Sequence, residues 1–176
     1  MYQDITVNSR AGVQRFWYRA EVIENSVDPV NNTSNVTITF YAWGKYNPQY
    51  DGYDEDVGII VDGETKVSQV NHSKRLGAEM REMCHWTGDI THDADGTKEI
   101  AVSVWLDCGG TASYLPKPSS EEEPLEILTC QLTPITRCII RIQRDGVKTG
   151  IVYIQRNGEA KVGQVYINRG GIKPGV

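Results

Sequence analysis

The residues of this 176-residue chain that could do chemistry are few, and they do not form a catalytic set. Three histidines occur, His72, His85 and His92, and Cys84 directly precedes His85. A cysteine paired with a histidine can act as a nucleophile, but neighbours in a β-strand point to opposite faces. No nucleophile elbow, His-Glu-x-x-His pattern, P-loop or dinucleotide glycine pattern is present. We therefore predict no catalytic residues and no enzymatic activity.

The segment His92-Asp93-Ala94-Asp95-Gly96 resembles part of a calcium-binding loop. A calcium loop needs a third oxygen ligand before the glycine and a distal glutamate, and the sequence offers neither. We interpret the segment as a hairpin turn in which Asp93 and Asp95 bond the local backbone and Gly96 is left-handed. We predict no metal site and no cofactor.

A loop rich in tyrosine and acidic residues is the candidate binding site. Tyrosine supplies contact area at low entropic cost, so such a loop can stack on sugar rings while its carboxylates bond hydroxyls or collect a cation. The alternative is an ordinary solvated acidic loop. The candidate residues for a receptor or a host-surface glycan are Tyr46, Tyr50, Tyr53, Asp51 and Asp54.

The four cysteines, Cys84, Cys108, Cys130 and Cys138, are widely spaced and form no Cys-x-x-Cys pair. The first residues of the chain lack a basic region followed by an apolar one, so we expect no secretory signal and synthesis in a cytoplasm. In a reducing compartment we expect buried or half-buried thiols, with disulfides or a metal as the alternatives.

The secondary-structure elements that must position these residues are predicted to be mainly β-strands. Apolar and polar residues alternate with the period of two that a half-buried strand requires. Asp62-Gly63 lies between two such runs and favours a tight hairpin. The predicted strands are 13–24, 36–46, 57–61, 65–70, 86–91, 98–106 and 125–132.

This count of strands, with frequent turn signals and no alternation with helices, predicts an all-β fold. We expect an antiparallel β-sandwich, immunoglobulin-like or jelly-roll-like, over residues 1–137. Residues 73–83 are the only stretch that could be a helix, although Gly77 weakens it. The proline- and glutamate-rich segment 116–124 is predicted to be a solvated loop.

After residue 137 the chain becomes repetitive. Ile142-Gln143-Arg144-Asp145-Gly146, Ile154-Gln155-Arg156-Asn157-Gly158 and Ile167-Asn168-Arg169-Gly170-Gly171 recur with a period of 12 to 13 residues. Each copy ends in a dipeptide suited to a tight turn, so residues 138–176 are predicted to form a small β-meander.

This repetitive segment needs a partner. The consecutive apolar residues 151–154 make both faces of one strand apolar, and a meander this small cannot cover two faces by itself. We expect it to mediate oligomerisation or docking. The residues predicted to do so are Ile151, Val152, Tyr153, Ile154, Val165, Tyr166, Ile167, Arg144, Arg156 and Arg169.

Charge is distributed unevenly along the chain. Residues 138–176 carry seven basic and two acidic side chains, a net charge of +5, whereas the remainder carries −10. A basic segment can bind nucleic acid, but beyond Tyr153 and Tyr166 it has no aromatic residues on which bases could stack. Pairing with the acidic body of a neighbouring copy explains the same charges, so we expect no nucleic-acid ligand. No run of about 18 apolar residues occurs, so we expect no membrane span.

Three landmarks, in this order, carry a resemblance to a known family. They are Asn31-Asn32-Thr33-Ser34-Asn35-Val36-Thr37, Thr91-His92-Asp93-Ala94-Asp95-Gly96-Thr97-Lys98 and Leu132-Thr133-Pro134-Ile135-Thr136-Arg137. Over residues 13–137 the chain resembles minor structural proteins of tailed phages and prophages of Gram-positive bacteria. The His-x-Ala-Asp-Gly-Thr-Lys element is the most specific part of this resemblance. The closing landmark departs from the usual Leu-Thr-x-Ile-Pro-Arg, because its proline is shifted.

The resemblance implies a virion protein of the tail or baseplate, without enzymatic activity and with no active site to carry over. We expect it to assemble with other virion proteins and with itself, and to contribute to host-surface attachment. The larger family members carry domains that this chain lacks, so capsid or tube decoration is one alternative. A carbohydrate-binding module is another.

Overall fold

The computed structural model describes residues 1–44, 54–72, 76–109 and 113–136, and the backbone of short strands between 138 and 160. These residues form strands and turns, and none of them belongs to a helix that could cross a membrane. The chain divides into two compact units, Met1–Ile135 and Thr136–Val176. The sequence placed this boundary after residue 137.

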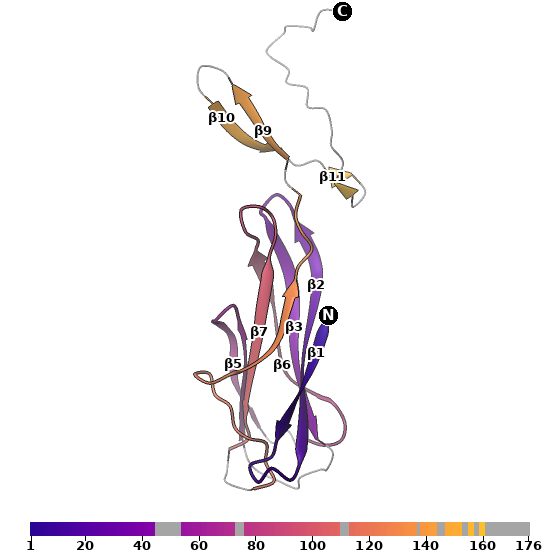
Figure 1. Cartoon of the computed structure of the whole chain (residues 1–176), viewed down its shortest axis with the longest axis vertical. Helices are drawn as coiled ribbons and strands as arrows, with labels where there is room; N and C mark the ends of the chain where they lie inside the picture. Colours follow the sequence, from indigo (N-terminus) through magenta and orange to yellow (C-terminus); the bar gives the residue numbers. More distant parts are fainter. Residues whose placement is uncertain are drawn as a thin grey trace, which may run out of the picture. The chain divides into compact units, whose positions relative to one another are not determined.

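The first unit consists of two packed antiparallel sheets (Figure 1). One sheet has the order β1 (Tyr2–Asn8), β2 (Arg15–Asp28), β3 (Thr33–Gly44) and β6 (Arg81–Thr91). The other has the order β5 (Glu64–His72), β4 (Asp54–Val61), β7 (Glu99–Asp107) and β8 (Leu125–Gln131). The predicted antiparallel β-sandwich is confirmed. Strand β1 was not predicted from the sequence.

The chain passes from one sheet to the other after β3, after β5 and again after β6. The predicted hairpin at Asp93–Gly96 is therefore wrong, because this turn links β6 of one sheet to β7 of the other. Alternation of apolar residues shows which side of a strand faces the core. It does not show whether two successive strands pair in one sheet or lie in opposite sheets. The left-handed conformation of Gly96 is confirmed, with φ +85°.

The helix predicted at 73–83 is also wrong in its described part. Residues 76–80 are irregular and β6 begins at Arg81. Leu76 is fully buried, and the Gly44 amide donates to the carbonyl of Gly77 at 2.7 Å. The segment thus closes an end of the core.

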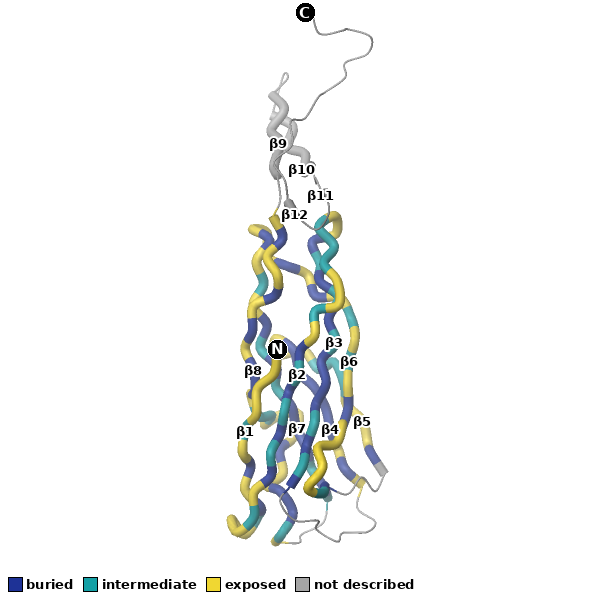
Figure 2. Tube along the Cα trace, turned by 90° about the vertical axis from the view of Figure 1, so that its right-hand side faces the viewer, coloured by how far each residue is buried: buried dark blue, intermediate teal, exposed yellow. Residues whose placement is uncertain are grey.

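The core lies between the sheets, where every second residue of the central strands is buried (Figure 2). Two fully buried rings, Tyr18 and Phe40, meet edge to face with their centroids 5.4 Å apart. The alternation of apolar and polar residues predicted for the strands at 13–24, 36–46 and 98–106 appears as burial of every second residue. Their buried members are Phe16, Tyr18, Ala20, Val22, Val36, Ile38, Phe40, Ala42, Ile100, Val102, Val104 and Leu106.

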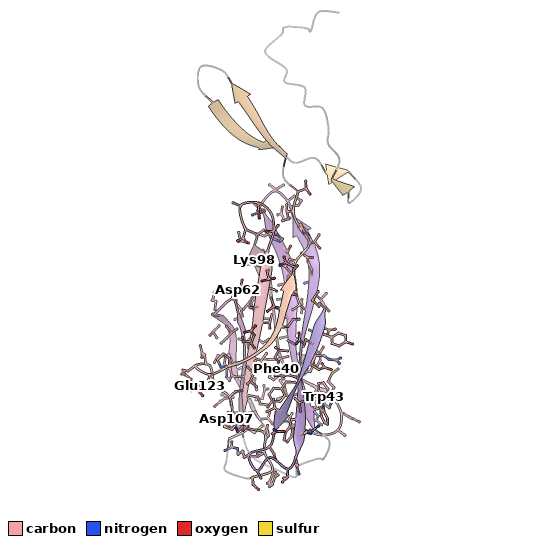
Figure 3. The ribbon with its side chains drawn as sticks, in the orientation of Figure 1. Phe40, Trp43, Asp62, Lys98, Asp107 and Glu123 are labelled. Atoms are coloured by element: carbon pink, nitrogen blue, oxygen red, sulfur yellow. The ribbon has the colours of Figure 1, made fainter. Side chains whose placement is uncertain are left out.

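The turn between β4 and β5 is the predicted Asp62-Gly63 pair. Both residues have positive φ, 51° and 80°, as the tight hairpin turn that suits twisted strands requires. Asp62 also exchanges hydrogen bonds with Ala101 of β7: its amide donates to the Ala101 carbonyl, and its carboxylate accepts from the Ala101 amide. Lys98 forms an ion pair with Asp62 at 2.7 Å (Figure 3).

The connection from β7 to β8 is not the fully solvated loop predicted at 116–124. The Leu106 amide donates to Ser119 Oγ at 3.0 Å, and Thr65 Oγ1 donates to Glu121 at 2.6 Å. Because Leu106 is in β7 and Thr65 in β5, the connection crosses the outer face of this sheet over β4. There Trp105 lies against Gly58 and is 4 % exposed.

The second unit contains two short antiparallel pairs. β9 (Cys138–Gln143) pairs with β10 (Val147–Val152), and β11 (Gln155–Arg156) pairs with β12 (Glu159–Ala160). These pairs flank the predicted turns at Asp145-Gly146 and Asn157-Gly158, which lie outside the described residues. They form two separate two-stranded sheets. The third repeat lies outside the described residues.

Candidate functional site

Most of the residues predicted to bind or dock lie outside the described part of the chain. Of the proposed binding loop, only Asp54 is described, as the exposed first residue of β4. The backbones of Ile151 and Val152 lie in β10, and that of Arg156 lies in β11. The other predicted binding and docking residues lie outside the described residues: Tyr46, Tyr50, Asp51, Tyr53, Arg144, Tyr153, Ile154, Val165, Tyr166, Ile167 and Arg169.

The structure brings the three landmark segments together at one end of the sandwich. They are the turn between β2 and β3, the turn between β6 and β7, and the segment that follows β8. Hydrogen bonds join the first segment to the second and the second to the third, and Glu24 of β2 links Ser34 of the first to Thr133 of the third. We call the residues that make these bonds the end clasp. Its members are Glu24, Asn32, Ser34, His92, Gly96, Thr133 and Ile135.

His92 is at the centre of the end clasp. Its side chain is 4 % exposed, and both ring nitrogens are engaged. Nδ1 lies 2.9 Å from the carbonyl oxygen of Gly96, and Nε2 lies 2.7 Å from the hydroxyl of Ser34. The ring therefore spans from its own turn to strand β3.

Glu24 extends this chain of contacts to the segment after β8. Its carboxylate accepts from the Ser34 hydroxyl at 2.5 Å and from the amide and hydroxyl of Thr133 at 3.1 Å and 2.5 Å. Partial burial raises the pKa of Glu24, but these hydrogen bonds and the nearby His92 outweigh it, so the pKa lies below its ordinary value. Glu24 is thus a charged anchor for Thr133.

Asn32 and Gly96 fix the backbones of the two turns. Asn32 adopts a φ of 59°, and its side-chain amide donates to the carbonyls of His92 and Asp93 at 2.8 Å and 3.1 Å. The Ile135 amide donates to the carbonyl of Gly96 at 2.8 Å. A side chain at Gly96 would place its Cβ 1.9 Å from the Ile135 carbonyl oxygen, so only glycine fits there.

The acidic residues of the β6–β7 turn behave partly as predicted. The Asp95 carboxylate accepts from the amide and hydroxyl of Thr97 at 2.9 Å and 2.7 Å, and these bonds lower its pKa. Asp93 takes part through its backbone: its amide donates to the Thr97 carbonyl, and its carbonyl accepts from the Gly96 amide. Among the described residues, no group of three or more His, Cys, Asp or Glu side chains could hold a metal ion.

The second sequence candidate, Cys84 with His85, separates as expected. Cys84 is 4 % exposed in the core, whereas His85 is on the outer face with Nδ1 2.7 Å from Glu82. Cys108 and Cys130 are buried as well, and burial raises the pKa of the Cys130 thiol. The side chain of Cys138 lies outside the described residues.

The open outer face of the β1-β2-β3-β6 sheet carries a row of stacked planar groups that we call the aromatic ladder: Tyr2, Arg19, Trp43 and Trp17. The guanidinium of Arg19 lies 4.1 Å from the ring centroid of Tyr2 and 5.7 Å from that of Trp43. The two indoles stack at 6.2 Å with an angle of 17°. The faces of these groups thus stack largely on one another, which stabilises the sheet through cross-strand contacts.

Asp4 fixes the ladder at its centre. Arg19 donates two hydrogen bonds to the Asp4 carboxylate, at 2.6 Å and 2.9 Å, and these bonds lower the pKa of Asp4. Both side chains are partly exposed, so the pair contributes little to stability beyond holding the guanidinium in place.

A groove of about 480 Å³ lies beside β1 and is lined partly by Ile5, Val7 and Leu125. Arg10 also lines it, but its guanidinium is engaged by Asp107 at 3.3 Å and by the Gly109 carbonyl. The groove thus has a mixed apolar and polar lining, and the guanidinium of Arg10 is already bonded within the protein.

The end clasp was not predicted from the sequence, although the three landmark segments contain all of its residues except Glu24. The missing information was that three turns far apart in the sequence meet at one end. The outward positions of Trp17 and Trp43 follow from strand alternation, because their neighbours Phe16 and Ala42 are buried. The aromatic ladder could therefore have been predicted from the sequence.

Comparisons with known proteins give no match: no family model, no curated protein and no solved structure corresponds to this chain.

Proposed function

We propose that this protein is a non-enzymatic structural component of a bacteriophage virion, in the tail or baseplate, with capsid or tube decoration as the alternative position. The end clasp is the observation that carries this proposal. The residues behind the resemblance to phage structural proteins are those that join the turns and tie down the segment after β8. A shared signature that maintains a fold suits a building block.

The chemistry of the end clasp supports a role without catalysis. Ser34 is fully buried, and both ring nitrogens of His92 are engaged by the protein. A nucleophile must reach its substrate and a general base must have a free nitrogen. In the end clasp the serine, the histidine and the glutamate are instead bonded to one another and to neighbouring segments of the chain.

The second unit supports a role in assembly. Its described strands form two short pairs, and isolated two-stranded sheets are marginal in water. Its net charge is opposite to that of the body, and opposite charges steer copies toward each other. We infer that residues 138–176 bind a neighbouring virion subunit or a second copy of the chain.

Incorporation into particles is the direct test. The strain that carries the gene is induced, and particles are separated from soluble protein by sedimentation. We expect the tagged full chain to sediment with the particles and a variant lacking residues 138–176 to remain soluble. Genes for a tape-measure protein, portal or holin beside this one are the matching genomic expectation.

A matched variant separates loss of docking from loss of folding. Glu126→Gln alters one exposed side chain of β8 and should sediment like the parent. Particles that form without the full chain, with all of it in the soluble fraction, would refute the proposal.

A further inference from the structure

The end clasp contains three consecutive hydrogen bonds whose protons can be counted. They run from the Gly96 carbonyl to His92 Nδ1 at 2.9 Å, from His92 Nε2 to Ser34 Oγ at 2.7 Å, and from Ser34 Oγ to Glu24 at 2.5 Å. A hydrogen bond needs one proton between its two heavy atoms. The chain therefore needs three protons.

The ordinary states of these groups supply only two. A neutral histidine carries one ring proton, a serine carries one hydroxyl proton, and an ionised glutamate carries none. The Gly96 carbonyl can only accept, so the first bond uses a proton on Nδ1. With a single further proton from Ser34, either the bond to His92 or the bond to Glu24 stays unmade.

The position of the third proton follows from the other partners of Glu24. Its carboxylate also accepts from the amide and the hydroxyl of Thr133, which favours the ionised form. Ser34 then donates to Glu24, and Nε2 must donate to Ser34. We propose that His92 is a buried imidazolium, bridged through Ser34 to the carboxylate of Glu24, and that this proton closes the end clasp.

The other charged side chains on the elements beside His92 are bonded elsewhere or exposed. On β6, Asp89 accepts from the side-chain amide of Asn35 at 2.7 Å. On β2, Asp28 accepts from the amides of Val30 and Asn31. On the turn itself, Asp95 is bonded to Thr97 and Asp93 is exposed. At the start of β7, Lys98 is paired with Asp62 of the β4–β5 turn. Strand β3 contributes no charge here, since Thr33, Ser34 and Asn35 are neutral.

The segment after β8 brings no charge from Leu132 to Thr136 either. Glu24 is therefore the anion that a proton on His92 would neutralise, across one serine hydroxyl.

The carboxylate of Glu24 makes the end clasp sensitive to acid. Folding favours the charged form of Glu24, so its contribution is present above its ordinary pKa of 4.5 and is lost as the pH falls through the lowered value.

Nitrogen NMR of the imidazole rings in the full chain tests the proposal without any mutation. At about pH 7.5, roughly one unit above the ordinary midpoint of histidine, we expect both ring nitrogens of His92 to have the chemical shift of a protonated nitrogen. One protonated and one bare nitrogen at this pH would overturn the proposal.

A pair of variants then assigns the cause. Glu24→Gln should move the loss of the second His92 proton to lower pH by about one unit, a tenfold change in proton affinity. Glu21→Gln, three residues earlier on the same strand, should leave it unchanged. Equal midpoints in the parent and Glu24→Gln would refute the bridge to Glu24.

Hydrogen exchange reads the same event at the backbone. The amides of Thr133 and Ile135 donate to Glu24 and to Gly96. As His92 loses its second proton, we expect these two amides to exchange faster than the intrinsic rise with pH, while core amides of β3 do not. Protection of both amides that stays constant through the titration of His92 would contradict the inference.

Discussion

At the scale of single residues, the chain depends on a few backbone positions that only one residue type can fill. Gly96 combines a φ of 85° with a carbonyl oxygen 1.9 Å from where its Cβ would stand. Gly63 has a similar φ of 80° but nothing within 4 Å. Substituting each glycine by alanine thus separates the energetic cost of a positive φ from that of a steric clash.

We expect Gly96→Ala to lower the free energy of unfolding by about 3 to 5 kcal/mol, because the methyl group would displace Ile135 from the end clasp. Gly63→Ala should cost only about 1 to 2 kcal/mol, the conformational part alone. Urea denaturation of both variants measures the difference. Equal losses would show that Ile135 does not restrain Gly96.

Residue types could be predicted at this scale, but their partners could not. The buried alternation of β2, β3 and β7 and the turn residues Asp62-Gly63 followed from the sequence. The contact between Glu24 and Thr133 did not, because it joins residues 109 positions apart. Hydrogen-bonding capacity is a property of a residue, whereas a partner is a property of the fold.

At the scale of elements, the two outer faces of the sandwich are treated differently. The β5-β4-β7-β8 sheet is crossed by the chain's own connection between Ser119 and Glu121, and the opposite sheet displays the aromatic ladder. The sequence predicted a solvated loop at 116–124 from its prolines and glutamates. It could not show that Ser119 bonds to β7 and Glu121 to β5.

We expect Gly58→Ala to loosen this connection. The new Cβ would stand 1.9 Å from the Trp105 ring and 2.3 Å from the Val67 carbonyl oxygen, so the indole must move outward. The free energy of unfolding should fall by about 2 to 3 kcal/mol. A glutamate-specific protease should also cleave faster at Glu121–Glu123, which are exposed.

Gly88→Ala is the control for this experiment. Its Cβ would meet the Trp86 ring at 2.3 Å, but on the other sheet. It should destabilise the protein without accelerating cleavage at Glu121–Glu123. Equal acceleration in both variants would mean that cleavage reports global unfolding and not the connection.

At the scale of the whole molecule, the chain joins an acidic sandwich to a basic, repetitive unit. The all-β class and the sandwich were predictable because strand periodicity and turn residues are local signals. The pairing of the strands into two sheets was not, since it depends on which strands cross the core.

We expect deletion of residues 138–176 to leave the free energy of unfolding of the body within about 0.5 kcal/mol of the parent, because the core lies within Met1–Ile135. The full chain should self-associate, and more weakly at high salt because its charges are then screened. Light scattering at several concentrations measures both constructs' masses. The same mass for both at every salt concentration would contradict a role of this unit in association.

The long-range hydrogen bonds of Glu24 also constrain the order of events during synthesis. Strands β1 to β3 can pair as hairpins as soon as they leave the ribosome, but the carboxylate of Glu24 must wait for Thr133. The body is therefore completed only when its last segment has emerged. Residues 138–176 are translated after that segment. The unit proposed to bind neighbouring subunits is therefore synthesised when the sandwich already has all the residues it needs to fold.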